Sequence, residues 1–588
     1  MEGGGTLVDL CLEAASRSAD SVRSWRRQRR TLEILPAHLA ESLLHQLLVK
    51  NLFSPPLLEL FQLSVEELDL NGELSVDAEW MAYIGGFRHL RVLKVESCKA
   101  LNNSAIWHLS GMESIEELRV DRCSKITNQG LEHILTLGKL KHLGLSETGI
   151  GEQGIGKLAV LRNLSHLDLG GLPVTDSHVS SLLVLQHLID LQLWGSSITN
   201  EGANMLKGFP RLEILNLAWT KVSVVPSMPR VSQLNLSHCV VLSVSEEGSA
   251  LDQLRLSGAT MQDPLRVLHS HSLPELSVLE LSATNLAALT FLGSLKRVVK
   301  LDLSSMPSVS SDTMNLLAKC ARNLKHLDLS DTRVGSEGVA VLTGHVPALE
   351  HLSLRGTSIT DSVFGYLGLM PSLIDIDLSN TSLTGAPVDS SFWSVLHLQQ
   401  LHNLRRLDLR RTRFSDKSCK RLACLVRLTH LLLCAEFLTD ASLHELSALP
   451  NLRSLAFQGT VLTDAGLRSL KPPLLLEELD LTDCWLLTEG CLLQFCDYYR
   501  SVTVKHDRIA GNLNSQRSSV RRMQVKNPHV PVKTQGKIGR DERIRYTFSE
   551  LHELRGLTSE VAAWEMSTLP RELSRTLQDE DHIEPSSS

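Results

Sequence analysis

The sequence has few cysteines, few aromatic residues and little excess of charge of either sign. Eleven cysteines in 588 residues are too sparse for a disulfide framework, so we expect reduced thiols and a cytoplasmic or nuclear location. Aromatic residues make up 4% of the chain, which predicts a core of leucine, valine and isoleucine. The formal net charge of −7 offers no general attraction for nucleic acid, and no nucleic-acid partner is expected.

Long uncharged apolar runs are also missing. No stretch of about 18 such residues could cross a bilayer, and no secretory signal is recognisable, so no membrane span is expected. We find no Ser/His/Asp set, phosphate loop or nucleotide motif in a credible context, and therefore predict no catalysis, no cofactor and no metal. A chain of 588 residues exceeds one compact core, so several domains or an elongated repeat array are expected.

One pattern, L-x-x-L-x-L, fills the middle of the chain. It recurs about eighteen times, mostly 24 or 25 residues apart, from VEELDL at 65 to LEELDL at 476. This period is typical of leucine-rich repeats. The alternating leucines turn one side of a short strand inward, and the Thr, Asp or Asn that follows caps a helix. We predict an α/β solenoid with a parallel sheet on its concave face and helices on its convex face.

The ninth position of each copy holds a small side chain that can form a hydrogen bond. The residues at this position include Cys98, Cys123, Cys239 and Cys484, and Thr148, Thr220, Thr284, Thr332, Thr357, Thr381, Thr412 and Thr460. We predict that they satisfy backbone groups in the turn that leaves each strand. Metal binding is the less favoured interpretation, because the four cysteines lack C-x-x-C spacing and threonine replaces them elsewhere.

Two stretches depart from the regular spacing. Between 212 and 276 the copies lie 19, 20 and 25 residues apart, across Pro226 and Pro229, and we expect this region to lose its helices. The 31-residue gap from 373 to 404 predicts an enlarged loop or a longer helix. The spelling of the copies resembles the cysteine-containing, ribonuclease-inhibitor-like type of leucine-rich repeat, which is the type attached to F-box substrate receptors.

A short apolar helix is predicted ahead of the repeats, in the stretch TLVDLCLEAA. Thr6 caps it, while Leu7, Cys11 and Ala15 share one face at intervals of four residues. That face either covers the open end of the solenoid or docks on another protein. The pattern T-L-x-x-x-C-x-x-x-A resembles the elongin-C-binding box of cullin–RING ubiquitin-ligase substrate receptors. The resemblance implies that Leu7 enters a pocket on the elongin and Cys11 packs beside it, with Thr6 and Ala15 as flanking positions.

A second match lies in the stretch LPAHLAESL. Its residues Leu35, Pro36, Leu39 and Leu43 resemble the downstream cullin-selecting box, and paired boxes before leucine-rich repeats resemble the zyg family of elongin-binding receptors. The same stretch also resembles the first half of an F-box, which binds a Skp-like adaptor, but the usual Val-Cys-Arg-x-Trp end is absent. Three interpretations stay open: an elongin-C-like adaptor with a cullin, a Skp-like adaptor, or a cap that binds no adaptor.

The concave face is the expected binding surface for an unknown protein substrate. Candidate contacts are two tryptophans near strand exits, a row of fifth-position aspartates and part of an arginine cluster. They are Trp194, Trp219, Asp302, Asp328, Asp377, Asp408, Arg410 and Arg411. Two histidine pairs, His142 with His166 and His326 with His351, are expected to touch, because adjacent strands lie about 4.8 Å apart.

The sequence divides into four parts. Residues 1–64 are predicted to be an N-terminal helical module that binds an adaptor or caps the array, and 65–504 the leucine-rich-repeat solenoid. Residues 505–545 contain eleven Lys/Arg against three Asp/Glu and predict a basic flexible linker. Residues 546–588 predict a C-terminal helix and a disordered tail. The resemblance implies a non-catalytic substrate-recognition subunit of a cullin–RING ubiquitin ligase. A leucine-rich-repeat scaffold or signalling adaptor unrelated to ubiquitin is the alternative.

Overall fold

The computed structural model describes most of the chain up to residue 510. The described residues are 7–16, 22, 35–50, 52–72, 76–244, 250–268, 275–386, 395–423, 425–435 and 437–510. They belong to a compact unit that spans residues 1–516, and a second unit comprises residues 517–588. Most of the predicted basic linker and all of the predicted C-terminal helix lie outside the described residues.

Every L-x-x-L-x-L copy forms a strand, as the sequence predicts. Consecutive strands pair in parallel and in register, and the second residue of the strand in each copy is a buried leucine or isoleucine. The 19 strands of this sheet are β1 (Glu67–Asp69), β2 (Val92–Lys94), β3 (Glu117–Arg119), β4 (His142–Gly144), β5 (His166–Asp168), β6 (Asp190–Gln192), β7 (Ile214–Asn216), β9 (Gln233–Asn235), β12 (Gln253–Arg255), β14 (Val278–Glu280), β15 (Lys300–Asp302), β16 (His326–Asp328), β17 (His351–Ser353), β18 (Asp375–Asp377), β19 (Arg406–Arg410), β20 (His430–Cys434), β21 (Ser454–Gln458), β22 (Glu478–Asp480) and β23 (Thr503–Lys505). The last strand is not a copy of the pattern, and it carries the sheet one residue past the predicted boundary at 504.

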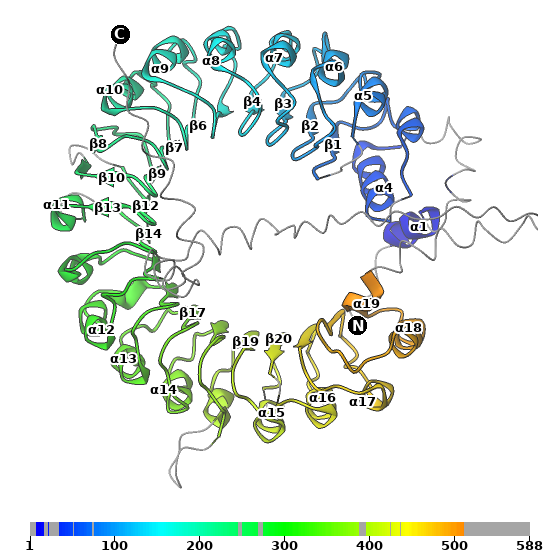
Figure 1. The fold of residues 1–588 in the computed structure, drawn as a ribbon, viewed down its shortest axis with the longest axis vertical. Helices are drawn as coiled ribbons and strands as arrows, with labels where there is room; N and C mark the ends of the chain where they lie inside the picture. The colour runs from blue at the N-terminus through cyan, green and yellow to red at the C-terminus, as the bar shows by residue number, and fades with distance from the viewer. Residues whose placement is uncertain are drawn as a thin grey trace, which may run out of the picture. The chain divides into compact units, whose positions relative to one another are not determined.

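Helices cover the outer side of this sheet, while the strands line the inner, concave side (Figure 1). The α-helices there are α5 (Ala78–Ile84), α6 (Asn103–Ile106), α7 (Asn128–Ile134), α8 (Glu152–Ile155), α9 (Asp176–Leu182), α10 (Asn200–Met205), α11 (Pro264–Leu268), α12 (Ser311–Leu317), α13 (Ser336–Leu342), α14 (Val363–Gly368), α15 (Asp416–Leu422), α16 (Asp440–Leu446), α17 (Asp464–Ser469) and α18 (Glu489–Tyr498). Short 3₁₀ segments accompany them at η3 (Trp107–Leu109), η4 (Gly156–Val160), η5 (Leu206–Gly208), η6 (Thr290–Ser294), η7 (Ala321–Asn323) and η8 (Val395–Gln400). None of the described helices has the length and apolar character that a membrane crossing needs.

The chain before and after the repeats is helical where it is described. The elements are α1 (Leu7–Ala15), α4 (Ala37–Val49), η2 (Pro55–Leu60) and, at the other end, α19 (Asp507–Ala510). The predicted N-terminal helix therefore forms, and α4 follows Pro36, whose fixed φ and missing N–H suit the position before a helix.

Most strands of the repeats leave the sheet through a residue in the left-handed backbone region. The non-glycine residues in this conformation are Ser97, Arg122, Glu147, Trp219, His238, Ala283, Ser305, Asp331, Asn380, Arg411 and Asp483. Hydrogen bonds to the following copy offset the cost of this conformation. The Arg122 amide, for example, donates to the Ser146 carbonyl at 2.7 Å, and the Trp219 amide donates to the Ser237 carbonyl at 2.9 Å. The leucine pattern does not predict this backbone conformation.

The ninth-position residues satisfy backbone carbonyls, as predicted. Thr148 Oγ1 donates to the Leu145 carbonyl of its own copy at 2.8 Å. Cys123 Sγ instead donates to the Val95 carbonyl of the preceding copy at 3.2 Å. Burial raises the pKa of the Cys123 thiol to about 11, which keeps the proton that this bond requires. Cysteine at this position therefore joins two copies, whereas threonine closes a turn within one copy.

The T-D segments that precede the helices also join neighbouring copies. Thr199 Oγ1 accepts from the Glu201 amide at 3.2 Å and so caps its own helix, as predicted. Asp176 does not cap its own helix but reaches the next copy. Its carboxylate accepts from the Thr199 amide at 2.9 Å and from the Thr199 hydroxyl at 2.6 Å. The Gly202 position must be small, because a Cβ there would collide with the Asp176 carboxylate.

The two irregular stretches differ from the rest on the outer side. In the described part of the first, short strands replace helices: β8 (Val224–Val225), β10 (Val240–Val241), β11 (Ser243–Val244) and β13 (Thr260–Met261). They pair in parallel, β8 with β11 and β10 with β13, so the two shortened copies lose their helices as predicted, whereas the copy that follows them keeps the short helix α11. In the second stretch, residues 387–394 lie outside the described residues, and the segment that follows is the short 3₁₀ helix η8.

Candidate interaction surfaces

Helix α1, the predicted adaptor-binding helix, packs on the unit through one side and is open on another. Leu12 and Ala15 are half-buried and contact the hydrophobic core. Cys11 is exposed. Thr6 lies outside the described residues, and of Leu7 only the backbone, as part of α1, is described. The helix thus keeps Ala15 against its own chain and leaves Cys11 accessible.

The residues of the predicted cullin-selecting box are divided between core and surface. Pro36 is exposed, while Leu35 and Leu39 are half-buried. Leu43 is only 3% exposed, and Leu47, one turn further along α4, is fully buried. This side of α4 therefore covers the apolar end of the solenoid, and Leu43 is not accessible to an adaptor in this conformation.

Two polar contacts complete this N-terminal cap. Ser16 Oγ donates to Gln46 Oε1 at 2.8 Å and so ties the end of α1 to α4. Glu41 Oε1 accepts from the amides of Glu66 at 3.1 Å and Glu67 at 2.9 Å, at the outer edge of the first strand. A sheet edge needs partners for its N–H groups, and here a helix side chain supplies them.

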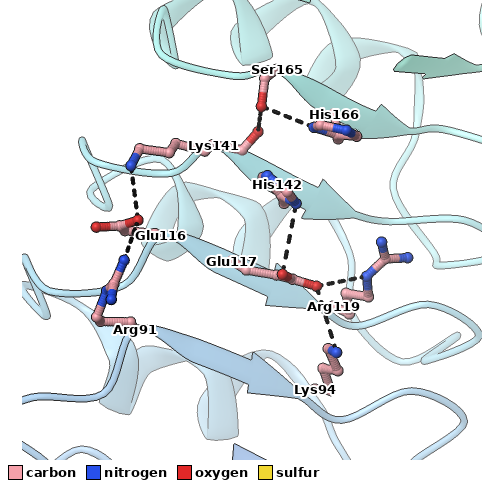
Figure 2. Close-up of polar contacts among 9 residues, drawn as sticks. All are labelled: Arg91, Lys94, Glu116, Glu117, Arg119, Lys141, His142, Ser165 and His166. Carbon is pink, nitrogen blue, oxygen red and sulfur yellow. Dashed lines mark hydrogen bonds and ion pairs between the residues drawn. The ribbon is translucent and has the colours of Figure 1, made fainter. Parts of the chain in front are cut away.

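The inner face begins with a set of paired charges on β2 to β4 (Figure 2). The Glu117 carboxylate lies 3.0 Å from Arg119 Nε, 3.6 Å from His142 Nδ1 and 4.0 Å from Lys94 Nζ. His142 stacks on His166 of the next strand, with ring centroids 4.1 Å apart, so this predicted contact is confirmed. Burial, together with the charge of His166, lowers the pKa of His142.

A second set of charges lies where these strands begin (Figure 2). Lys141 Nζ and Arg91 Nη2 both contact Glu116 Oε2, at 2.8 Å and 3.2 Å. Their hydrogen bonds lower the pKa of Glu116 to about 2. Ser165 Oγ donates to the Lys141 carbonyl at 3.1 Å and lies 2.9 Å from His166 Nδ1. The charges of this region are therefore largely compensated within the chain.

The fifth position of the copy that forms β5 holds an aspartate with an unusual pKa. Asp168 is half-buried and accepts from the Gly170 amide at 2.9 Å. Burial, with a smaller contribution from the charge of Asp121, raises the pKa of Asp168 to about 6. Asp121 itself is buried and accepts from the Ser146 amide at 2.8 Å and the Ser146 hydroxyl at 2.7 Å.

The middle of the inner face carries mainly amides, and its two charged groups have partners: Asp190 on β6 accepts from Gln192 Nε2 at 2.6 Å, and Arg255 on β12 contacts Glu280. A shallow depression of about 50 Å³ extends over β6, β7, β9 and β12. Its polar side chains are Gln192, Asn216, Gln233, Asn235, Gln253 and Arg255. The sequence analysis missed this group, although the signal is visible in the spellings LQL, LNL, LNL and LRL of four consecutive copies.

The two predicted tryptophans differ in exposure. Trp219, at a strand exit, is 62% exposed and stacks on His238, with ring centroids 3.9 Å apart and planes inclined by 18°. Trp194 is half-buried, and its indole occupies the space that a side chain at Gly170 would need. Trp219 is therefore available as an aromatic anchor, whereas Trp194 is partly engaged by its own chain.

The predicted acidic row is real only in part. Asp302 and Asp328 lie side by side in register, but Ser353 separates them from Asp377. Burial is the main cause of the raised pKa of Asp328, and the charges of Asp302 and Asp377 add to it. Among the described residues, no three His, Cys, Asp or Glu side chains form a group that could hold a metal ion.

The second histidine pair lies beside this row. His326 and His351 stack with ring centroids 4.3 Å apart, as predicted. His351 Nδ1 lies 3.6 Å from the Asp375 carboxylate, which Arg406 Nε approaches at 3.8 Å from the other side. The two histidines, Asp375 and the adjacent aspartates line a depression of about 360 Å³.

The row ends in an internal ion pair. Asp408 is only 3% exposed, and Arg410 Nε and Nη2 contact its two oxygens at 3.0 Å and 2.6 Å. Neither side chain is therefore a free charge for a partner. This corrects the expectation that Asp408 and Arg410 are contacts for the protein substrate. Arg411 is exposed at the strand exit.

Comparisons with known proteins support the repeat type. A family model described as "Leucine Rich repeat" matches residues 320–342. A search of curated proteins gives no match. Among solved structures, the mouse RP105/MD-1 complex is 16% identical and covers 77% of this chain and 81% of that one, with a TM-score of 0.47. A leucine-rich-repeat protein of Leptospira interrogans is 18% identical, covers 75% and 95%, and has a TM-score of 0.38.

An internalin of Listeria monocytogenes is 21% identical and covers 56% of this chain and 88% of that chain, with a TM-score of 0.40. These similarities are too low to carry function or detailed geometry. The repeated strand, left-handed exit and outer helix of the described residues carry the assignment instead. The described residues therefore fold as a leucine-rich-repeat solenoid with a parallel sheet of 19 strands.

Proposed function

We propose that this protein is a non-catalytic interaction module that serves as the substrate-recognition subunit of a cullin–RING ubiquitin ligase. One observation carries the proposal. Helix α1 is held by Leu12 and Ala15 against the unit, while Val8, 45% exposed, and Cys11 lie open on the same helix. A helix that binds an adaptor must keep accessible the side chains that enter the adaptor, and Val8 and Cys11 meet this condition.

In this role α1 binds an elongin-C-like adaptor, which connects to a cullin, and the inner face of the sheet binds the protein substrate. The protein itself breaks no bond. It raises the local concentration of substrate lysines near the conjugating enzyme. The role implies a cytoplasmic or nuclear location.

The alternatives differ in what α1 and α4 contact. A Skp-like adaptor would require the leucines of the F-box-like stretch, and Leu43, Leu44 and Leu47 are buried in the chain's own core. This burial counts against the Skp assignment, and for Leu43 it counts equally against a cullin contact through the predicted cullin-selecting box, so the elongin assignment depends on α1. A scaffold outside ubiquitin chemistry would use the same inner face and would leave α1 as part of the cap.

Co-purification of the full-length protein with its adaptor tests the proposal. We expect elongin C to be recovered with the wild type and to fall by about tenfold or more with Leu7→Ala/Cys11→Ala, because a truncated anchor loses its pocket contacts. Val49→Ala is the matched control, since Val49 is 68% exposed on the neighbouring α4. Equal recovery from all three proteins would contradict the proposal. Recovery of a Skp adaptor in place of elongin C would support the F-box-like assignment. Recovery of neither adaptor would support the scaffold alternative.

A further inference from the structure

We propose that the middle of the inner face, from β6 to β12, binds an uncharged, extended polypeptide segment that carries an aromatic or proline ring. We call this region the amide site; it consists of Gln192, Asn216, Gln233, Asn235 and Gln253 with the ring pair Trp219 and His238. The inference rests on the interaction function proposed for the inner face, and it names the substrate class. It does not depend on which adaptor α1 binds.

The charge distribution of the inner face selects an uncharged ligand. On β7 and β9, the inward-facing positions hold Ile214 and three amide side chains. The one cation of the depression, Arg255, has its Nε 3.3 Å from the Glu280 carboxylate of the next strand. A charged ligand group placed over these amides would lose its hydration without gaining an ion pair. A peptide backbone would also lose hydration, but hydrogen bonds to the amides would replace it.

The amides match the hydrogen-bonding groups of a peptide backbone. Asn216 Oδ1 accepts from the Ala218 amide at 3.1 Å, and Asn235 Oδ1 accepts from the Ser237 amide at 3.0 Å. In both turns the side-chain oxygen is the atom that accepts from the backbone. The Nδ2 group of each asparagine takes no part in the turn and can donate to a ligand carbonyl. Gln233 is in register with residue 253, where a second glutamine adds both a donor and an acceptor.

The shape of the depression points to the backbone as the group that it receives. Its volume of about 50 Å³, set against the roughly 10–15 Å³ that one water needs, leaves room for small polar groups such as those of a peptide backbone. A side-chain anchor can lie at the rim, and the rim of the same copies carries Trp219 and His238. Trp219 follows Asn216 by three residues, and His238 follows Asn235 by three, so the amides form one row across the strands and the rings form a second row beside it.

The ring pair is supported by its neighbour and is not an accidental contact. His238 lies over Gly258, where an added Cβ would come within 2.5 Å of the imidazole. The left-handed conformation of Gly258, with φ of 64°, does not itself demand glycine, because Ser305 and Ala283 adopt the same conformation in the next copies. The space for His238 is what requires glycine at 258. Stacking on an exposed indole suits aromatic and proline rings.

The experiment pans a phage-displayed library of random twelve-residue peptides against the full-length chain. We expect the enriched peptides to be uncharged and to contain an aromatic residue or proline. A synthetic copy of the strongest peptide, labelled for fluorescence polarisation, should bind about tenfold or more weakly to Trp219→Ala. It should weaken similarly for Gln233→Ala/Gln253→Ala, which removes amides without touching the rings. Trp107→Ala is the matched control, because Trp107 is 58% exposed on the outer side.

Three results would overturn the amide site: enrichment of charged peptides, no enrichment at all, or equal binding by the wild type and both inner-face variants. Two inner-face variants are used so that misfolding of one does not decide the outcome, and circular dichroism checks each fold. Elongin recovery distinguishes the two proposals. Loss of the amide site with elongin still recovered leaves the ligase role standing, and peptide binding without elongin leaves a scaffold with this ligand class.

Discussion

Single side chains join each repeat to the next. Cysteine and threonine at the ninth position are both small and polar, and the sequence treats them as interchangeable. In the structure they differ, because Cys239 Sγ reaches the Leu217 carbonyl of the preceding copy at 3.1 Å, whereas Thr284 Oγ1 bonds to Leu281 of its own copy at 2.7 Å. The choice of residue therefore decides whether the side chain bonds within its own copy or to the preceding copy.

Asp168 gives a residue-scale prediction about pH. Its pKa is raised from 3.8 to about 6, so the folded state binds this proton more tightly than the unfolded state. Stability from this group is therefore fully present below about pH 4 and is lost as pH rises towards 6. Asp168→Asn keeps an acceptor for the Gly170 amide without the charge. We expect it to raise the free energy of unfolding by about 1–2 kcal/mol at pH 7.5 and by little at pH 4.

Denaturant unfolding at the two pH values measures this difference, and Asp480→Asn is the control with the opposite sign. Burial would raise the pKa of Asp480, but hydrogen bonds from Thr482 and Gln458 outweigh it and lower the pKa. Stability from Asp480 is present above its unfolded pKa and is lost as pH falls. Asp480→Asn should therefore destabilise at pH 7.5. Destabilisation by both variants at pH 7.5 would refute the assignment for Asp168.

At the scale of elements, a repeat is held to its neighbour through the start of its outer helix. Asp361 repeats the arrangement of Asp176, since its carboxylate accepts from the Thr384 amide at 2.9 Å and also contacts the Thr384 hydroxyl. The same arrangement joins Asp416 to Thr439. At Thr199 and Thr439, the N-cap residues of α10 and α16, these contacts place a carboxylate beside the first turn of the next helix, which also favours a negative charge.

Gly202→Ala tests this junction between α9 and α10. The new Cβ would collide with the Asp176 carboxylate, which two hydrogen bonds hold in place. We expect a loss of about 1–3 kcal/mol, as for overpacking in a core. Gly156→Ala is the control, because nothing lies within 4 Å of its added Cβ, and it should be neutral or slightly stabilising. Equal effects in denaturant unfolding of the two variants would contradict the close contact.

Most elements could be predicted from the sequence, and the reason is local. The inner-face strands from β1 to β22 follow from the leucine spacing, and the missing helices follow from shortened copies with Pro226 and Pro229. The strand at Thr503–Lys505 could not be predicted, because it lacks the pattern and forms by pairing with Glu478–Asp480. The short strands on the outer side escaped prediction for the same reason: only their partners define them.

At the scale of the whole unit, stability spreads from copy to copy, because each repeat contacts chiefly its neighbours. Helix α4 covers the first copy with Leu43, Leu44 and Leu47, and Glu41 satisfies the edge of β1. Loss of this cap should therefore loosen the first repeats and leave the distant ones intact.

Leu47→Asp tests this gradient, because it places a charge at a fully buried position of α4. We expect amide hydrogen exchange in β1 to β3 to become about tenfold faster or more, while exchange in β20 to β22 stays as in the wild type. Val49→Asp changes an exposed residue of the same helix and should leave both regions unchanged. Uniform acceleration along the chain would show instead that the unit unfolds as one cooperative body.

The candidate site divides in the same way between sequence and structure. Trp219 and the histidine pairs were placed by register alone, since residues at one position of adjacent copies must lie side by side. Register alone could not identify the ionic partners. Asp408 looks free in the sequence, yet Arg410, two residues on, folds back to bind it. The side chains around Leu43 likewise turn inward, because the end of the sheet offers them an apolar surface.

The sequence by itself determined the solenoid, its strand positions, its direction of stacking and its irregular region, because a hydrophobic period acts within each copy and repeats. Only the tertiary structure decided which charges are already spent on one another, which face of the N-terminal helices is buried and where uncharged amides meet exposed rings. These properties depend on side chains of different copies that come together when the array stacks, and no single copy contains that information.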